Sequence, residues 1–319
     1  MGDRTHGVII GRFMPPHNGH RYLIDFALGC VDRVTILVGT LTSDPIDGAL
    51  RCRWMREMFP DADIIRITEE NPNARKGAPD SYRIWARGII ERAGDDIDYV
   101  FASEDYGFRL AEELGAVYIP VDPARTVFPV SATMVRRNPV VTWKYIPDVI
   151  RPYFVRKVYV LTEQPGEADT LLERLSDHFS TVCVGDYVAY HAEQTGEGKL
   201  SPEFAVRAQL AAEHALARQA DRVLFSASDA VHAWLRAQSN RALPDEFETQ
   251  TNGWSRARYL ISPPQNSTER SVHDREALPR ISQSLEVLAS RGADVRVLTG
   301  GVEERFTQAV EAVDDILRD

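Results

Sequence analysis

The sequence of 319 residues predicts an α/β fold, and three observations lead to this class. Short apolar runs, such as residues 33–39 and 157–161, have the length of strands buried on both faces. Segments with apolar residues at helical spacing separate these runs. Because strands and helices alternate, we expect parallel β–α–β units and a doubly wound sheet in the first half, and α/β structure again in the second.

The first half alternates regularly as far as residue 120. Gly11 and the prolines at 15 and 16 end the first apolar run, and an amphipathic segment follows. Strands are expected at 7–10, 33–39, 63–67, 99–102 and 116–120, and helices at 20–29, 50–59, 81–94 and 108–114. Such a sheet binds ligands at the carboxyl ends of its strands, near the point where the strand order reverses.

The second half begins after the proline-flanked residues 147–152. Strands are expected at 157–161, 222–225, 257–262 and 294–299, helices at 167–178, 201–219, 276–291 and 302–318, and a loop at 263–267. We therefore expect two domains, residues 1–152 and 153–319, in line with about 150 residues per domain.

Composition narrows the class of protein. Hydrophobic residues make up 44% and charged residues 26%, as in soluble globular proteins with substantial cores. Lys and Arg number 37 against 47 Asp and Glu, so the net charge is −10. General nucleic-acid binding is disfavoured, because it depends on neutralising phosphates. A local basic pocket for a phosphorylated small molecule remains compatible with this charge.

Cysteine usage and hydropathy favour a cytoplasmic protein. Cys30, Cys52 and Cys183 are far apart and have no accompanying histidine cluster, so we expect reduced core residues rather than zinc ligands or disulfides. The chain has no run of about 18 apolar residues. Its N-terminus lacks the basic and apolar segments of a signal peptide. Secretion and membrane spanning are therefore disfavoured.

Residues 11–20 (GRFMPPHNGH) carry the first candidate site. They join an expected strand to an expected helix, where backbone N–H groups and the positive helix end favour phosphate. Gly11 and Gly19 allow close approach of the backbone, and His17 and His20 can both face one phosphate. The alternative is a turn with two surface histidines. No third ligand lies near the histidines in sequence, so we expect no protein-held metal.

Residues 131–136 (SATMVR) carry the second candidate site. They begin an expected helix, and Ser131 is equally suited to cap it. Thr133 and Arg136 are three residues apart and can face one ligand, and a guanidinium can hold phosphate through two hydrogen bonds. Combined with the histidine loop, this segment can clamp a triphosphate from both ends.

The two segments resemble the (H/T)xGH and SxTxxR signatures of nucleotidylyltransferases. More specifically, the chain resembles the bifunctional NadR type, in which a nicotinamide mononucleotide (NMN) adenylyltransferase is fused to a ribosylnicotinamide kinase. The likeness covers nearly the whole length. It includes residues 51–55 (RCRWM), 101–107 (FASEDYG), 121–125 (VDPAR) and 143–147 (WKYIP).

This resemblance implies adenylyl transfer from ATP to the 5′-phosphate of NMN, giving NAD and pyrophosphate without a covalent enzyme intermediate. The catalytic residues it implies are Arg12, His17, His20 and Arg136, with His20 at the α-phosphate. The ATP-binding residues it implies are Gly11, Phe13, Gly19, Ser103, Ser131 and Thr133. Mg²⁺ is the expected cofactor, bound through the nucleotide phosphates and water rather than by a protein cage.

Trp85 and Tyr82 are the residues expected to bind the nicotinamide ring. By the resemblance, Trp85 stands at the position of a ring-stacking tryptophan, and Tyr82 replaces a second tryptophan. An apolar helix stripe facing the core is the alternative for both. Ser103, Glu104 and Asp105 follow an expected strand, where the family contacts adenosine. An acidic first turn of a helix explains these three equally well.

The second domain resembles a kinase that has lost its phosphate-binding loop. The pattern GxxxxGK(S/T) would follow the strand at 157–161, but residues 162–170 are TEQPGEADT. Ala168 takes the place of the lysine and Asp169 that of the hydroxyl. Glu163 and Glu167 add negative charge, which no Lys or Arg of the loop compensates.

Two further segments differ from the kinase pattern. Ala227 replaces one of two paired aspartates and leaves only Asp229. Residues 266–270 lack the family's acidic residue and glycine, although Arg270 remains. We therefore expect a degenerate kinase fold that does not transfer phosphoryl groups.

Two other functions stay open. One is nucleotidyl transfer to a different phosphorylated acceptor, favoured by Tyr82, by the altered kinase loop and by the short segment 40–49. The other is an NAD- or ATP-binding regulatory protein, against which the complete set of phosphate-binding residues argues. The expected partners are ATP and NMN or a related phosphorylated small molecule. Neither nucleic acid nor membrane is expected as a partner, and a homo-oligomer is left open.

Overall fold

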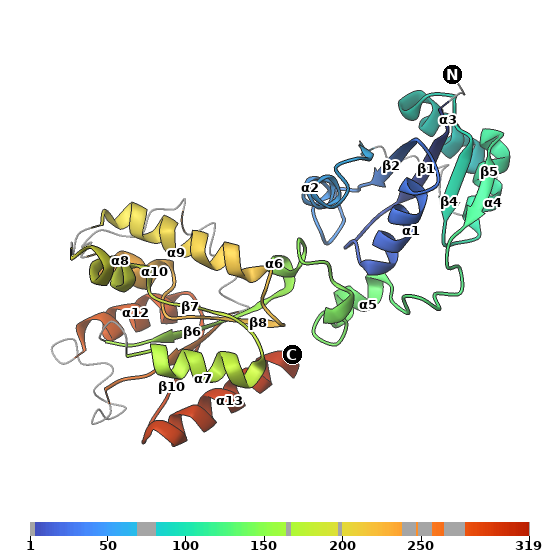
Figure 1. Cartoon of the computed structure of the whole chain (residues 1–319). Helices are drawn as coiled ribbons and strands as arrows, with labels where there is room; N and C mark the ends of the chain where they lie inside the picture. The colour runs from blue at the N-terminus through green and yellow to red at the C-terminus, as the bar shows by residue number, and fades with distance from the viewer. Residues whose placement is uncertain are drawn as a thin grey trace. The chain divides into compact units, whose positions relative to one another are not determined.

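The computed structural model describes residues 4–68, 81–163, 167–196, 200–237, 247, 257–264 and 278–318. The chain divides into two compact units, residues 1–150 and 151–319. Each unit is built on a parallel sheet of five strands. Figure 1 shows helices packed around the strands of each unit. The α/β class expected from the sequence is therefore confirmed.

The sheet of the first unit has the strand order β3-β2-β1-β4-β5, which reverses direction at β1. Its strands are β1 (His6–Gly11), β2 (Arg33–Gly39), β3 (Asp63–Ile67), β4 (Tyr99–Ala102) and β5 (Val117–Pro120). All neighbours pair in parallel, and Gly7 of β1 lies opposite both Val34 and Tyr99. The carboxyl ends of β1, β2 and β4 therefore meet at one edge of the sheet.

Helices cover both faces of this sheet, because successive strand residues point to opposite sides. The helices are α1 (Asn18–Leu28), α2 (Gly48–Met58), α3 (Ser81–Ala93), α4 (Tyr106–Leu114), α5 (Ala132–Arg137) and the 3₁₀ turn η2 (Trp143–Tyr145). Ile9 packs with side chains of α1 and α2, and its neighbour Val8 packs with side chains of α3 and α4. The first sheet is therefore doubly wound.

The second unit has the strand order β10-β9-β6-β8-β7. Its strands are β6 (Arg156–Leu161), β7 (Cys183–Val184), β8 (Val223–Ser226), β9 (Ala257–Ile261) and β10 (Asp294–Val297). Its helices are α6 (Arg151–Phe154), α7 (Asp169–Phe179), α8 (Tyr187–Thr195), α9 (Pro202–Ala217), α10 (Ala230–Arg236), α12 (Pro279–Ser290) and α13 (Val302–Arg318).

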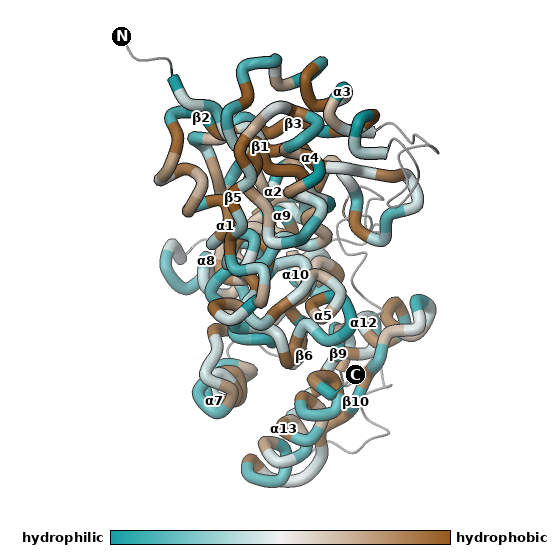
Figure 2. Tube along the Cα trace, turned by 90° about the vertical axis from the view of Figure 1, so that its right-hand side faces the viewer, coloured by the Kyte–Doolittle hydropathy of each residue, from teal (hydrophilic) through white to brown (hydrophobic). Residues whose placement is uncertain are grey.

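Alternate residues of β6 build two cores in this unit. Val158 and Val160 pack with α7 and α13, and Tyr159 and Leu161 pack with α12 on the other face. Hydrophobic and hydrophilic residues alternate along the traces of α7 and α13 (Figure 2), as expected for helices with one buried face.

Four described elements of the second unit were not expected from the sequence: α6, β7, α8 and α10. Strand β7 has two residues, which is too short for a periodic signal. Helix α8 has end signals instead, because the carboxylate of Asp186 accepts hydrogen bonds from two backbone N–H groups and Gly196 is left-handed at φ +68°. The capping residues Asp186 and Gly196 were therefore the sequence signal from which α8 could have been predicted.

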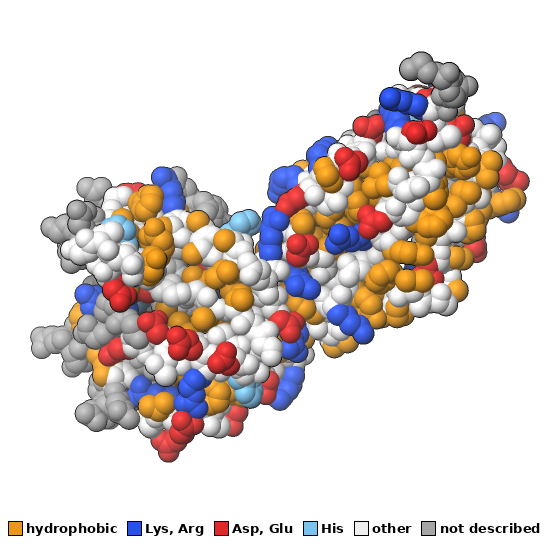
Figure 3. All heavy atoms as spheres, in the orientation of Figure 1, with side chains coloured by type: hydrophobic (Ala, Val, Ile, Leu, Met, Phe, Trp, Pro, Cys, Tyr) orange, Lys and Arg blue, Asp and Glu red, His pale blue; other side chains and the backbone are white. Residues whose placement is uncertain are grey.

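The expectation of core cysteines is wrong for Cys30. Cys52 is buried and Cys183 half-buried, but Cys30 is exposed, and all three are free thiols. Acidic and basic side chains are interspersed on the face seen in Figure 3, so the net negative charge does not produce a uniformly acidic surface. Among the described residues, no helix has both the length and the apolar character needed to cross a bilayer.

Candidate active site

A cavity of about 1260 Å³ opens in the first unit at the carboxyl ends of β1, β2 and β4. All residues that the sequence marked as catalytic, ATP-binding or substrate-binding line it, with the exception of Tyr82. The residues concerned are Gly11, Arg12, Phe13, His17, Gly19, His20, Trp85, Ser103, Ser131, Thr133 and Arg136. Folding thus brings the histidine loop and the 131–136 segment, which are far apart in sequence, to one cavity.

His17 and His20 form a stacked pair at the start of α1. Their ring centroids are 3.8 Å apart, with an angle of 25° between the ring planes. The backbone N–H of His17 donates to Nδ1 of His20 over 3.3 Å. His17 is buried and His20 half-buried, so the alternative of two surface histidines is wrong.

Burial keeps both imidazoles neutral. Burial, and to a smaller extent the positive charge of Arg125, lower the pKa of His17 to about 4. The pKa of His20 lies well below its ordinary value, because of burial and then of the neighbouring His17 and Arg125. Since Nδ1 of His20 accepts a hydrogen bond, we assign its proton to Nε2. His20 therefore offers the cavity an uncharged N–H donor.

The glycines of the loop make room for rings. A Cβ on Gly19 would lie 3.1 Å from the imidazole of His17, and one on Gly11 would lie 3.0 Å from the ring of Phe13. Phe13 is buried at φ +46° and meets His20 edge-on, with centroids 5.0 Å apart. Both glycines thus leave space for the rings that pack against His20. The sequence instead predicts that these glycines allow a ligand to approach the backbone.

The 131–136 segment is tied to the histidine loop through Arg136. Its guanidinium donates to the carbonyl of Met14 and, over 3.3 Å, to Oγ1 of Thr133. Oγ of Ser131 accepts the N–H of Met134 over 3.3 Å, so Ser131 caps α5 while also lining the cavity. Arg136 and Thr133 therefore face one place beside the loop.

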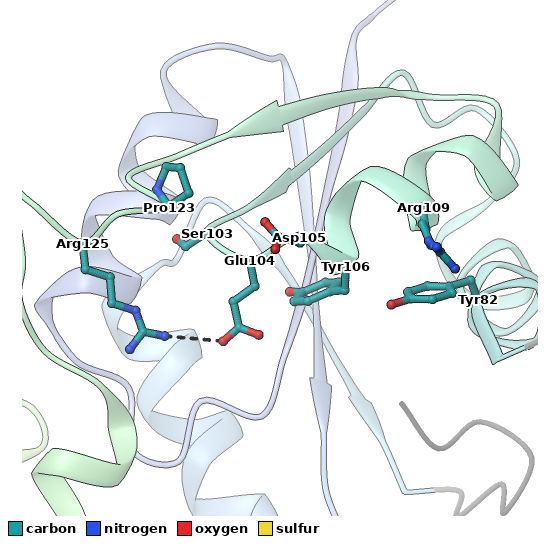
Figure 4. Close-up of a pocket in the computed structure, with 8 residues that line it drawn as sticks. All are labelled: Tyr82, Ser103, Glu104, Asp105, Tyr106, Arg109, Pro123 and Arg125. Atoms are coloured by element: carbon teal, nitrogen blue, oxygen red, sulfur yellow. Dashed lines mark hydrogen bonds and ion pairs between the residues drawn. The ribbon is translucent and has the colours of Figure 1, made fainter. Parts of the chain in front are cut away.

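A second cavity of about 500 Å³ adjoins the first and is drawn in Figure 4. The carboxylate of Glu104 and the guanidinium of Arg125, which are 3.5 Å apart, line both cavities. Tyr82 lines only this smaller cavity, where the guanidinium carbon of Arg109 lies 6.0 Å from its ring centre. The structure therefore assigns Tyr82 and Trp85 to different cavities.

Tyr82 and Trp85 also pack on the protein core. Their ring centroids are 5.5 Å apart at 70°, and both are half-buried against the cluster between the sheet and helices α3 and α4. The core alternative is thus partly correct for both side chains. Trp85 keeps a face in the larger cavity.

Sequence reasoning assigned no role to Arg125 and Asp122. Both have positive φ, +52° and +46°, in the turn after β5. The carboxylate of Asp122 accepts the backbone N–H groups of Thr126, Val127 and Phe128 at 2.7, 3.1 and 3.3 Å. This holds the turn that carries Arg125. The residues lie in the VDPAR stretch, which was noted for its resemblance alone.

The loop after β6 in the second unit is arranged around Glu163. Its buried carboxylate accepts the backbone N–H groups of Arg280 and Ile281 at 3.4 and 3.2 Å, and the guanidinium of Arg280 lies 3.5 Å away. The positive charge that the loop itself lacks is thus supplied by Arg280 of α12. Ala168 is buried. The pKa of the Asp169 carboxyl is raised, first by its own burial and second by the negative charge of Glu173.

Asp229 is committed to structural hydrogen bonds. Its carboxylate accepts the N–H of His232 at 2.7 Å, which caps α10, and the hydroxyl of Tyr259 at 3.0 Å. Burial raises its pKa to about 6, although these hydrogen bonds lower it. Ala227 is buried beside it. Residues 164–166 and 265–277, which include the expected Arg270, lie outside the described residues.

Both units have α/β folds on parallel sheets, and the first is a doubly wound, Rossmann-like sheet whose carboxyl edge carries the larger cavity. The trifunctional NAD biosynthesis/regulator protein NadR of Escherichia coli (strain K12) is 30% identical over 252 residues, which are 72% of this chain and 61% of that protein. The NadR of Salmonella typhimurium is 29% identical over 249 residues. The chain is homologous to NadR and spans about three fifths of the length of these curated relatives.

Solved structures agree in fold. A crystal structure of NadR in complex with NAD and AMP-PNP superposes with a TM-score of 0.74 and 21% identity, covering 99% of this chain and 97% of that one. A NadR structure in complex with NR gives 0.72 at the same identity, with 99% and 96% covered. No family model matches the chain.

Proposed function

We propose that the first unit transfers the adenylyl group of ATP to the 5′-phosphate of NMN, releasing pyrophosphate and forming NAD. The observation that carries this proposal is the convergence of the histidine pair with Thr133 and Arg136 at one cavity. Homology to NAD biosynthesis proteins supports it, as does the nucleotide content of the NadR complexes.

The reaction needs no covalent enzyme intermediate. A phosphate oxygen of NMN bonds to the α-phosphorus of ATP, and the bond from that phosphorus to the bridging oxygen of pyrophosphate breaks. Negative charge spreads over the phosphoryl oxygens, so fixed donors supply the catalysis. His20 would donate from Nε2 to the α-phosphate, and Arg136 with Thr133 would hold the departing phosphates.

Arg12 and His17 complete the phosphate environment. The half-exposed guanidinium of Arg12 lines the cavity and supplies positive charge, and His17 supports the ring of His20 by stacking. Mg²⁺ would supply positive charge that neutralises the phosphates. The described residues contain no group of three or more His, Cys, Asp and Glu that suits a metal ion, so we assign the ion's ligands to nucleotide and water.

Trp85 is proposed as the ring partner of the pyridine. It is the aromatic side chain of α3 that lines the larger cavity, with Tyr106 6.4 Å away edge-on. Trp85→Ala should raise the KM for NMN about fivefold and the KM for ATP much less, because stacking is worth on the order of 1 kcal/mol. Tyr82→Ala is the matched comparison. Equal changes in both KM values would mean that Trp85 only packs in the core and does not contact the pyridine ring.

A second acceptor class is favoured by one observation. Tyr82 and the exposed guanidinium of Arg109 form one side of the smaller cavity, next to the Glu104–Arg125 pair. A phosphorylated acceptor other than NMN could place an anionic group there. Product mass spectrometry with nicotinic acid mononucleotide in place of NMN decides between the acceptors.

We further propose that residues 153–319 form a domain without kinase activity, separate from the transferase at 1–152. Glu163 accepts a backbone hydrogen bond from α12 and forms an ion pair with Arg280. Ala168 is buried at the position where a kinase of this type would have its phosphate-binding lysine. Asp229 is held by His232 and Tyr259. These groups are engaged in the fold rather than free for a nucleotide.

One assay tests both halves of the proposal. Pyrophosphate release from ATP and Mg²⁺ is measured with NMN, nicotinic acid mononucleotide and ribosylnicotinamide, and each product is weighed by mass spectrometry. NAD from NMN, with ribosylnicotinamide left unphosphorylated, is the expected result. Phosphorylated ribosylnicotinamide would overturn the inactive second domain, and no product from any acceptor would overturn the transferase.

A further inference from the structure

One carboxylate lies between two arginines beside the larger cavity. Asp44, in the loop between β2 and α2, is almost fully buried. One of its oxygens pairs with the guanidinium of Arg12 and the other with that of Arg51. The backbone N–H of Leu41 donates to this second oxygen over 3.0 Å. Asp44 thus has a fixed position and links Arg12 to Arg51.

Arg51 is the rigid side of this arrangement. It is fully buried, and its guanidinium donates to the carbonyls of Ile46 at 3.0 Å, of Gly39 at 3.1 Å and of Arg12. Gly39 ends β2, and Arg12 directly follows β1. Arg51 therefore joins the carboxyl ends of both strands to the loop and leaves one direction of its planar fork for Asp44.

Arg12 is the exposed side of this arrangement. Its side chain is 54% exposed and lines the cavity. Holding a free arginine in one rotamer costs about 2 kcal/mol of conformational entropy. Pairing with the Asp44 carboxylate offsets this cost before any nucleotide binds, because Arg51 and the N–H of Leu41 hold that carboxylate in place.

We propose that Asp44 is a positioning residue, which holds the guanidinium of Arg12 at the phosphates during adenylyl transfer; this rests on the proposed function. Two effects of Asp44 oppose one another. Its negative charge reduces the net charge of the three groups from two positive units to one, which weakens attraction for ATP. Its fixed geometry improves the alignment of Arg12 in the transition state.

The variant Asp44→Asn separates these effects, because it keeps the shape and removes the charge. We expect kcat to fall by about 10- to 100-fold, since misplacement by about 1 Å can cost 10²-fold in rate. The Kd for α,β-methylene ATP, which cannot be cleaved at the reacting bridge, should stay equal or become lower. A purely structural role would instead weaken binding and lower the melting temperature together.

Arg12 supplies the second measurement. In an Arg12→Ala background, adding Asp44→Asn should change kcat by less than about twofold, since residues that act through one another are not additive. Asp47→Asn is the matched control in the same loop. Asp47 caps α2 through the N–H of Leu50 at 2.8 Å and does not line the cavity, and asparagine caps equally well, so kcat should be unchanged.

The outcomes are distinct. An unchanged kcat in Asp44→Asn, or an undiminished loss when Arg12 is already alanine, would overturn the positioning role. If Asp44→Asn unfolds because Arg51 loses its counter-charge, Asp44→Asn with Arg51→Gln removes both charges and should show the same loss of kcat; wild-type kcat in that variant would also overturn it. Turnover of the wild-type protein tests the proposed function. The ratio of variant to wild-type kcat tests the positioning role of Asp44, so either hypothesis can fail without the other.

Discussion

The backbone N–H of His17 donates to Nδ1 of His20, and this single hydrogen bond decides which nitrogen of His20 carries the proton. The proton belongs on Nε2, where it serves as a donor to a phosphate oxygen. Because burial keeps the ring neutral, the donor acts through its fixed direction rather than through a formal charge.

His20→Ala should lower kcat by about 10²- to 10³-fold, the usual cost of removing one preorganised donor to a transition state. The Kd of ATP should change by less than about tenfold, since the donor matters most when charge develops. Pyrophosphate release and calorimetric binding measure the two quantities. His214→Ala, at an exposed position of α9, is the control. Equal losses in kcat and binding would contradict the assignment.

His17→Asn should make stability less dependent on pH. Folded His17 stays neutral down to about pH 4, because of burial and then Arg125, whereas the unfolded chain protonates it near 6.5. Stability is therefore lost as the pH falls from 6.5 to 4, by on the order of 3 kcal/mol for this group. Asparagine still caps α1 but does not titrate. Melting temperatures across this pH range should fall less in the variant; parallel curves would argue against the lowered pKa.

Arg136→Ala should reduce kcat/KM for ATP by about 10²-fold or more, because Arg136 faces the cavity and also holds the Met14 carbonyl. The adjacent Arg137→Ala is the matched control, since Arg137 is exposed and does not line the cavity. It should change kcat/KM by less than about twofold. Comparable losses in both variants would mean that general positive charge, rather than the position of Arg136, binds the phosphates.

Gly19→Ala should impair turnover although alanine favours helices by about 1 kcal/mol over glycine. The added Cβ would lie 3.1 Å from the His17 ring and displace the stacked pair. Gly29→Ala, after the other end of α1, meets only carbonyl oxygens at 3.5 Å and has φ −78°, so it should be tolerated. Steady-state kinetics of the two variants provide the comparison. Full activity of Gly19→Ala would show that the pair tolerates displacement.

The strands other than β7 and the two site segments could be predicted because their signals are local. Apolar runs of strand length marked β2 and β6, and the spacing of His17 and His20 placed both at one helix start. Helix α8 was missed because its interior residues are all at least partly exposed and so lack an apolar stripe, and only its capping residues Asp186 and Gly196 mark it.

Contacts between distant segments were decided by the tertiary structure alone. The sequence by itself determined the alternation of strands and helices and the chemical content of the phosphate-facing segments, since both depend on neighbouring residues. It did not determine that Arg280 compensates Glu163, that Asp44 joins Arg12 to Arg51, or that Tyr82 and Trp85 face different cavities. Those relations depend on which side chains the packed sheets and helices bring within hydrogen-bonding distance, and no local pattern encodes that distance.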